Sequence, residues 1–201
     1  MQRLANSDKE LYATFYNLMA SGVRLPSGSK WNVLRAVTDD AMFPGYKHHI
    51  RFAVLTLDGR GLEHYGECAL VLRDNMIAHR ASVFEENSVL FMERHGIRVA
   101  DAHMLPHGYR AIWEDRRTLC AAKLADRLEP GTERSEYPRI LLQNGATGDK
   151  DTFVEVHIWG PLTARSIERV VVTEPKRKGA RVILRALRER LESLGVQWET
   201  N

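Results

Sequence analysis

The 201-residue sequence lacks several features that would assign a chain to a class at once. It has only two cysteines, Cys68 and Cys120, which are too few for a disulfide framework or a four-thiolate zinc site. No apolar run approaches the roughly 20 residues of a membrane span, and the first residues lack an apolar stretch of signal-peptide length. We therefore expect no membrane partner, no secretion by that route and a location in the reducing cytoplasm.

The best-known cofactor motifs are also missing. The sequence has no G-x-G-x-x-G, no Walker A loop, no His-Glu-x-x-His and no Cys-x-x-Cys pair. Charge of either sign is not in large excess, since 29 basic residues face 26 acidic ones and the net charge is +3. Such a mildly basic chain can contact nucleic acid, but its charge does not require that partner.

The order of sequence periods predicts an α+β fold with a mixed, mostly antiparallel sheet. Residues 1–45 read as an N-terminal helical segment, with Ser7 and Glu10 as a capping box and Ser29 as the cap of a second helix. Residues 46–201 read as an α+β domain of catalytic type, and the two parts are expected to form one structural unit. The domain should contain one central helix and a C-terminal amphipathic helix.

Local patterns assign the elements of this domain. Strands are expected at residues 49–57 and 65–73, joined as an antiparallel pair by the turn around Gly59. Further strands are expected at 139–143, 151–159 and 169–173. Helices are expected at 108–128 and 175–194, while the apolar run 87–95 suits either state.

The strand at 151–159 carries the most informative pair of side chains. Glu155 and His157 are two residues apart, so an extended chain places them on the same face, with Val154, Val156 and Ile158 on the other. A carboxylate beside an imidazole can serve as a general base, and it is also what the wet face of an edge strand looks like. Both interpretations remain open at this level.

Three other segments have a functional and a structural interpretation. His49 and Arg51, sharing a strand face, could contact phosphate or form a polar strand surface. The polar segment 79–88 could hold a ligand, or Ser82 could cap a helix with Glu85 completing the box. Arg110, Arg116 and Arg117 with Trp113 could bind a nucleic acid, or face solvent around a core tryptophan.

The order of these motifs resembles the ADP-ribosyltransferase-like toxins and effectors. Arg51 on an early strand, the run 64–67 opening a second strand, Ser82 within Arg80–Ala81–Ser82 and Glu155 on a late strand carry the resemblance. The family usually has Glu or Gln two residues before its catalytic glutamate, where this sequence has Phe153.

The resemblance implies that NAD is the substrate and that ADP-ribose passes to a protein or nucleic-acid acceptor. A carboxylate can stabilise the oxocarbenium-like state of that cleavage. It also implies delivery into a target cell and an inhibitor or immunity partner. The resemblance implies that the catalytic residues are Glu155, His157 and Ser82. It implies that the residues binding NAD are Arg51, His49, Tyr65 and Arg80.

Two other functions are consistent with the same residues. Asp149 or Asp151 with Glu155 and His157 could form the acid cluster of a metal-dependent nuclease. The basic last helix and the Arg-rich central helix could instead make a non-enzymatic binding module for nucleic acid or protein. Convergence of Arg51, Ser82 and Glu155 in one cleft is what the transferase requires.

Overall fold

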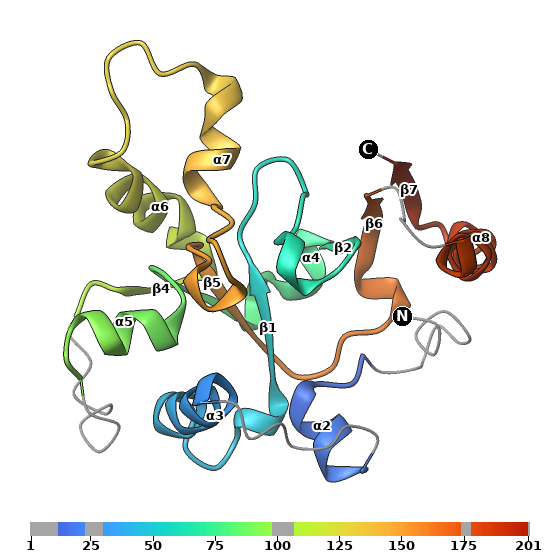
Figure 1. Ribbon diagram of the computed structural model, residues 1–201, viewed down its shortest axis with the longest axis horizontal. Coiled ribbons are helices and arrows are strands. Elements are labelled where there is room, and N and C mark those ends of the chain that lie inside the picture. Colours follow the sequence, from blue (N-terminus) through green and yellow to red (C-terminus); the bar gives the residue numbers. More distant parts are fainter. Residues whose placement is uncertain (1–11, 23–29, 98–106, 174–177, 201) are drawn as a thin grey trace. The chain divides into compact units, whose positions relative to one another are not determined.

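The computed structural model describes residues 12–22, 30–97, 107–173 and 178–200 (Figure 1). The α+β class expected from the sequence is confirmed, but the strands form two sheets instead of one. The chain folds into two compact units. Unit 1 comprises Met1–Tyr12, Thr56–His79 and Pro161–Asn201, and unit 2 comprises Ala13–Leu55 and Arg80–Gly160. The segment Ala13–Leu55 belongs to unit 2, so the described helices of the N-terminal part lie in the same unit as the strands of 80–160.

Unit 2 contains a four-stranded antiparallel sheet in the order β1-β5-β3-β4. Its strands are β1 (Ile50–Val54), β3 (Ala81–Phe84), β4 (Arg110–Ile112) and β5 (Glu155–Trp159). Its α-helices are α2 (Phe15–Ala20), α3 (Lys30–Met42), α5 (Ser88–Arg94), α6 (Arg116–Ala125) and α7 (Tyr137–Leu141).

Helices cover the sheet of unit 2 and create its core. The end of α3 and the middle of α5 contribute Met42 and Phe91 to a cluster with Ile50 and Phe84, while α6 packs against β3. On the other face of the sheet Val83, Val156 and Ile158 are also buried. Residues of β5 are therefore buried on both faces of the sheet, from Glu155 to Ile158, while Trp159 at its end is exposed.

Local signals explain where two of these helices begin. At the start of α2, the Thr14 side chain accepts a hydrogen bond from the Asn17 backbone N–H, and the Asn17 side chain accepts one from the Thr14 backbone N–H. The two side chains thus bind backbone N–H groups that have no partner within the helix. Asn87 caps α5 by accepting from the Val89 N–H at 3.1 Å. The ambiguous run 87–95 is thus helical. Ser7, Glu10 and Ser29, the caps expected from the sequence, lie outside the described residues.

Unit 1 is built on a three-stranded sheet in the order β2-β6-β7. Its elements are β2 (Cys68–Leu72), α4 (Asp74–Ile77), β6 (Ile167–Val172), α8 (Lys178–Glu192) and β7 (Gln197–Thr200). The pairing of β2 with β6 is antiparallel and that of β6 with β7 is parallel. Leu187 and Leu191 of α8 pack with Ile167 and Val170 of β6, which confirms the amphipathic C-terminal helix.

The expected hairpin of strands 49–57 and 65–73 is wrong. Both strands exist, but β1 pairs with β5 and β2 pairs with β6, in different units. The turn signal itself is real, because Gly59 has a φ of 79° and the Thr56 hydroxyl accepts from its N–H at 3.2 Å. Local turn chemistry closes a loop here without deciding which strands pair.

Three further sequence expectations are corrected. Residues 139–141 form the end of α7 and not a strand, because Pro138 sits in the first turn of a helix, where its fixed φ is favourable. Of the expected strand, Gln143 keeps one isolated antiparallel bridge to Thr152. The helix expected over 108–128 begins only at Arg116, since residues 110–112 pair with β3 as β4. Ser82 lies within β3 and caps no helix. The short strand β7 was not expected at all.

Within the described segments, no helix combines the length and apolarity needed to cross a bilayer.

Candidate functional site

The site is organised by β5, the central strand of unit 2. Glu155 and His157 do share a face, as the alternation predicts, and the Glu155 Oε1 lies 2.8 Å from the His157 Nε2. The strand lies between β1 and β3, so the interpretation as a wet edge strand is wrong. Glu155 is 1% exposed and His157 is 2% exposed. The pair is therefore a buried polar element under α3 and α5.

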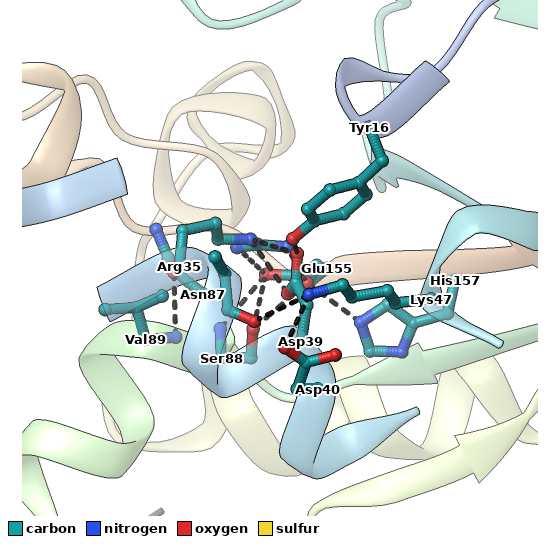
Figure 2. Close-up of polar contacts among 11 residues, drawn as sticks. Tyr16, Arg35, Asp39, Asp40, Lys47, Asn87, Ser88, Val89, Glu155 and His157 are labelled. Carbon is teal, nitrogen blue, oxygen red and sulfur yellow. Dashed lines mark hydrogen bonds and ion pairs between the residues drawn. The ribbon is translucent and has the colours of Figure 1, made fainter. Parts of the chain in front are cut away.

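Glu155 is the acceptor at the centre of a hydrogen-bond network (Figure 2). Arg35 of α3 donates to its two oxygens from Nη1 at 3.1 Å and from Nη2 at 2.7 Å. Ser88 of α5 donates to it from its backbone N–H at 3.0 Å and from its hydroxyl at 3.2 Å. A bidentate guanidinium and a backbone N–H are the partners that make a buried carboxylate tolerable. The network thus joins both covering helices to the sheet.

Arg35 also carries a second buried carboxylate. Its Nε lies 3.0 Å from the Asp39 Oδ1, one helical turn along α3, and the Tyr16 hydroxyl of α2 donates to Asp39. Asp39 is 1% exposed. One guanidinium therefore pairs with two carboxylates that are both removed from water.

Burial and partners push the pKa values of this network in different directions. Burial alone would raise the pKa of Glu155, but Arg35 and the His157 hydrogen bond outweigh it and hold that pKa well below its ordinary value. Burial raises the pKa of Asp39 to about 6, because Arg35 and Tyr16 offset only part of the desolvation. Burial, with the nearby Asp39 charge, also raises the pKa of the Tyr16 hydroxyl, which therefore remains a donor.

The surroundings of His157 favour its neutral form, because its pKa is lowered. Burial lowers the pKa of its imidazole, and the hydrogen bond to Glu155 opposes this only in part. Because Glu155 is ionised and can only accept, the His157 Nε2 carries the proton and donates it. The Nδ1 of a neutral imidazole in this tautomer is an acceptor, and among the described residues it has no hydrogen-bond partner. A buried base with a free lone pair is the result.

His157 also lines a cavity of about 240 Å³ in unit 2. No carboxylate is among the described residues that line it, whereas two guanidinium groups are. The lining residues are Phe43, Tyr46, Ile50, Arg80, Ala81, Ser82, Arg110, His157 and Trp159. The cavity therefore combines positive charge, a hydroxyl, an imidazole and aromatic rings.

Of the two arginines of the cavity, Arg80 is half-buried and Arg110 is exposed, and each contacts a residue of the cavity wall. The guanidinium carbon of Arg110 lies 5.4 Å from the centre of the Phe43 ring, and the Nη1 of Arg80 donates to the Trp159 carbonyl at 2.6 Å. Burial lowers the pKa of both guanidinium groups, and Tyr46 and Glu155 oppose this at Arg110. Both stay charged at neutral pH, because an arginine guanidinium is not deprotonated in proteins. Two such cations beside one cavity attract an anionic group.

The structure brings four of the sequence-predicted site residues together. Ser82 is the register partner of His157 across β3 and β5, and Glu155 and His157 are joined by their hydrogen bond. Arg80, Ser82 and His157 line the same cavity. Glu155 is not among the residues that line the cavity, and its oxygens accept hydrogen bonds from Arg35, Ser88 and His157.

Three predicted residues lie elsewhere. Arg51 is the register partner of Ile158, so it points to the face of the sheet opposite Glu155. His49 does not share its face, because it belongs to a short 3-10 helix before β1 and its ring lies 5.3 Å from that of Trp159. Tyr65 belongs to unit 1, where it is 66% exposed. The convergence of Arg51, Ser82 and Glu155 that the transferase requires is therefore not found.

The acid cluster of a metal-dependent nuclease does not form either. Asp149 is exposed, and Asp151 is buried with its Oδ1 accepting from the Gly145 N–H at 2.8 Å. Over residues 12–22, 30–97, 107–173 and 178–200, no three His, Cys, Asp or Glu side chains are grouped as metal ligands would be.

The Arg-rich segment around Trp113 was expected either to bind nucleic acid or to face solvent around a core tryptophan. Trp113 is a core residue, and Arg116 lies over its ring at 4.5 Å while donating to its carbonyl. Arg117 is exposed on α6. Arg110, in contrast, contributes to the cavity.

No protein-family model matches the sequence, and the search of curated proteins also finds no match.

Sequence reasoning missed the residues that support the site. Arg35 and Asp39 are spaced i, i+4, a pattern that usually marks a solvated helix face. Tyr46 and Phe43 follow α3 in a turn, where nothing in the local pattern indicates a cavity wall. The one available signal was Trp159, an aromatic residue that continues the alternation of Glu155 and His157 on the same face.

Proposed function

We propose that the chain binds a small ligand with a negatively charged group in the cavity of unit 2, and that His157 accepts a proton from this ligand. One observation carries the proposal: a buried neutral imidazole, fixed by Glu155 through Nε2 and free at Nδ1, lines a cavity that contains two arginines. Buried histidines with one nitrogen held by a carboxylate are suited to general-base chemistry.

Each part has a separate task in this proposal. Arg80 and Arg110 attract and orient the anionic group, for which a guanidinium offers paired donors. Ser82 offers a hydroxyl at the cavity wall. Glu155 keeps His157 in the Nε2–H tautomer, and Arg35 holds Glu155 in place. Arg35 and Glu155 are therefore positioning residues, while His157 contacts the ligand.

NAD is one member of the ligand class, because its pyrophosphate is an anion. NAD cleavage, a protein or nucleic-acid acceptor, an inhibitor partner and action in a cytoplasm remain proposals that rest on the resemblance of motif order alone. The opposite orientation of Arg51 and the fully bonded state of Glu155 weaken the transferase, because neither residue is presented as that chemistry needs.

The first prediction tests binding. Wild-type protein is expected to bind pyrophosphate in calorimetric titrations, and Arg110→Met should weaken binding roughly 10- to 100-fold, as loss of one charge-assisted hydrogen bond does. Arg117→Met, which removes an exposed arginine of α6, is the matched control and should bind as wild type does. Pyrophosphate binding that is absent, or equal in the two variants, would refute the proposal.

The proton-transfer part has its own readout. In ¹⁵N NMR spectra of histidine-labelled protein, pyrophosphate should shift the His157 Nδ1 resonance in the wild type and not in Arg110→Met at the same concentration. A shift confined to other histidines would remove His157 from the proposal. Nicotinamide release from NAD, lost in Glu155→Gln, would support the transferase, and its absence with intact pyrophosphate binding would leave the pocket without that activity.

A further inference from the structure

The anion binding proposed for Arg80 and Arg110 does not use the aromatic rings of Tyr46 and Trp159, which also line the cavity. Trp159 ends β5, two residues after His157, and is 48% exposed although its neighbours on the strand are buried. Its ring centre lies 5.4 Å from that of Tyr46 and 5.3 Å from that of His49. Three rings therefore gather beside the cavity, and the largest of them is half open to solvent.

The size of the cavity limits what it can enclose. Its volume of about 240 Å³ lies below the roughly 300–1,000 Å³ of pockets that enclose a drug-sized ligand. A ligand larger than its anionic group must therefore extend out of the cavity. Trp159 lines the cavity and is also exposed, so it is a surface that such an extension would meet.

We infer that the ligand is a phosphorylated compound with a flat aromatic ring, a mononucleotide, whose phosphate lies by Arg80 and Arg110 while its base stacks on Trp159. This inference rests on the proposed function and names its ligand class. Stacking on an aromatic side chain suits any base because every base has a flat π-face, and it adds to the attraction of the phosphate for the arginines. The ring pair of Tyr46 and His49 would hold the Trp159 indole in position.

The second prediction compares ligands that differ only in the base. AMP is expected to bind the wild type roughly 5- to 100-fold more tightly than ribose 5-phosphate, the range that one base–aromatic stack contributes. In Trp159→Ala this advantage should shrink to less than about twofold, because neither compound then has an indole on which to stack a base. Trp159→Phe, which keeps an aromatic ring, should retain part of the advantage.

Matched controls separate the ligand class from the pocket itself. Tyr65→Ala removes an exposed aromatic residue of unit 1 and should leave both affinities unchanged. Equal affinities of the wild type for AMP and ribose 5-phosphate, or an AMP advantage that persists in Trp159→Ala, would overturn this inference alone. If neither phosphate compound binds and pyrophosphate does not bind either, the proposed function fails with it.

Discussion

At the scale of single residues, Arg35 is the most consequential side chain of unit 2. It pairs with Glu155 and Asp39 at once, and both carboxylates are almost completely buried. Buried ion pairs often add little net stability, but removing one partner leaves an uncompensated charge in a low-dielectric interior. The cost of losing Arg35 should therefore exceed the net contribution of the pairs themselves.

A third prediction follows. Arg35→Met should lower the free energy of unfolding by about 3–5 kcal/mol, the usual cost of breaking a buried pair, as measured by urea denaturation. The double variant Arg35→Met/Glu155→Gln should lose less than the sum of the two single changes, since it leaves one buried charge fewer. Arg188→Met, which breaks an exposed pair with Glu192 on α8, should change stability by less than about 1 kcal/mol. Strict additivity of the two single changes would contradict this account.

Asp39 gives a fourth prediction, on pH. Its folded pKa of about 6 lies above the ordinary value of 3.8, so between these pH values the folded state binds more protons than the unfolded state. The contribution of Asp39 is therefore fully present below pH 4 and is lost as the pH rises to 6. Asp39→Asn lacks this loss, so the stability of the wild type relative to this variant should fall as the pH rises from 4 to 6.

Urea denaturation of both proteins at several pH values measures this difference. Glu155 acts in the opposite direction, because a carboxyl with a lowered pKa stabilises at high pH and loses that contribution as the pH falls. Since Glu155 is present in both proteins, its effect cancels in the comparison to first order. If the stability of the wild type relative to Asp39→Asn instead rose with pH, the Arg35 ion pair would outweigh desolvation in setting the pKa of Asp39.

Residue patterns alone predicted part of the site. That Glu155 and His157 share a face follows from the strand period, and their register partner Ser82 was already a candidate. Their burial could not be predicted, because it depends on α3 and α5, which supply Arg35 and Ser88 over this face, and on the central position of β5 in the sheet. That position is set by pairing with strands about 70 and 100 residues earlier in the chain.

At the scale of elements, strong periodic segments were predicted well and short ones were not. The C-terminal amphipathic helix and the strands β1, β2, β5 and β6 were expected close to where they lie. The three-residue strand β4 was assigned to a helix, because its residues precede a true helical pattern and owe their extended form to β3. For such short elements the partner strand outweighs local propensity.

The turn before β5 carries a fifth prediction. A Cβ added at Gly145 would lie 2.4 Å from the carbonyl oxygen of Lys150, a backbone atom that cannot move aside cheaply. Gly145→Ala should therefore destabilise the protein by about 1–3 kcal/mol, as other overpacking changes do. Ala146→Ser, at the exposed neighbouring position, should stay within about 0.5 kcal/mol. Equal melting temperatures for Gly145→Ala and the wild type would contradict the tight turn.

At the scale of the whole chain, the surprise is the interleaving of the two units. Unit 2 takes up Ala13–Leu55, the chain then supplies Thr56–His79 to unit 1, and it returns to unit 2 from Arg80 to Gly160. The sequence predicts several local elements but not this order, because turn signals such as Gly59 indicate a bend and not which strands pair across it. The two sheets could therefore not be separated by pattern alone.

The pairing of the early strands β1 and β2 with the late strands β5 and β6 has a consequence while the chain is being synthesised. Among the strands that the structure describes, β1 pairs only with β5 and β2 only with β6, in each case a partner about one hundred residues further along. At roughly 5–20 residues per second on a ribosome, each early strand waits about 5–20 s for its partner. Throughout that time the nascent chain presents unpaired strand edges, so its folding yield in cells should depend on chaperones that shield β1 and β2.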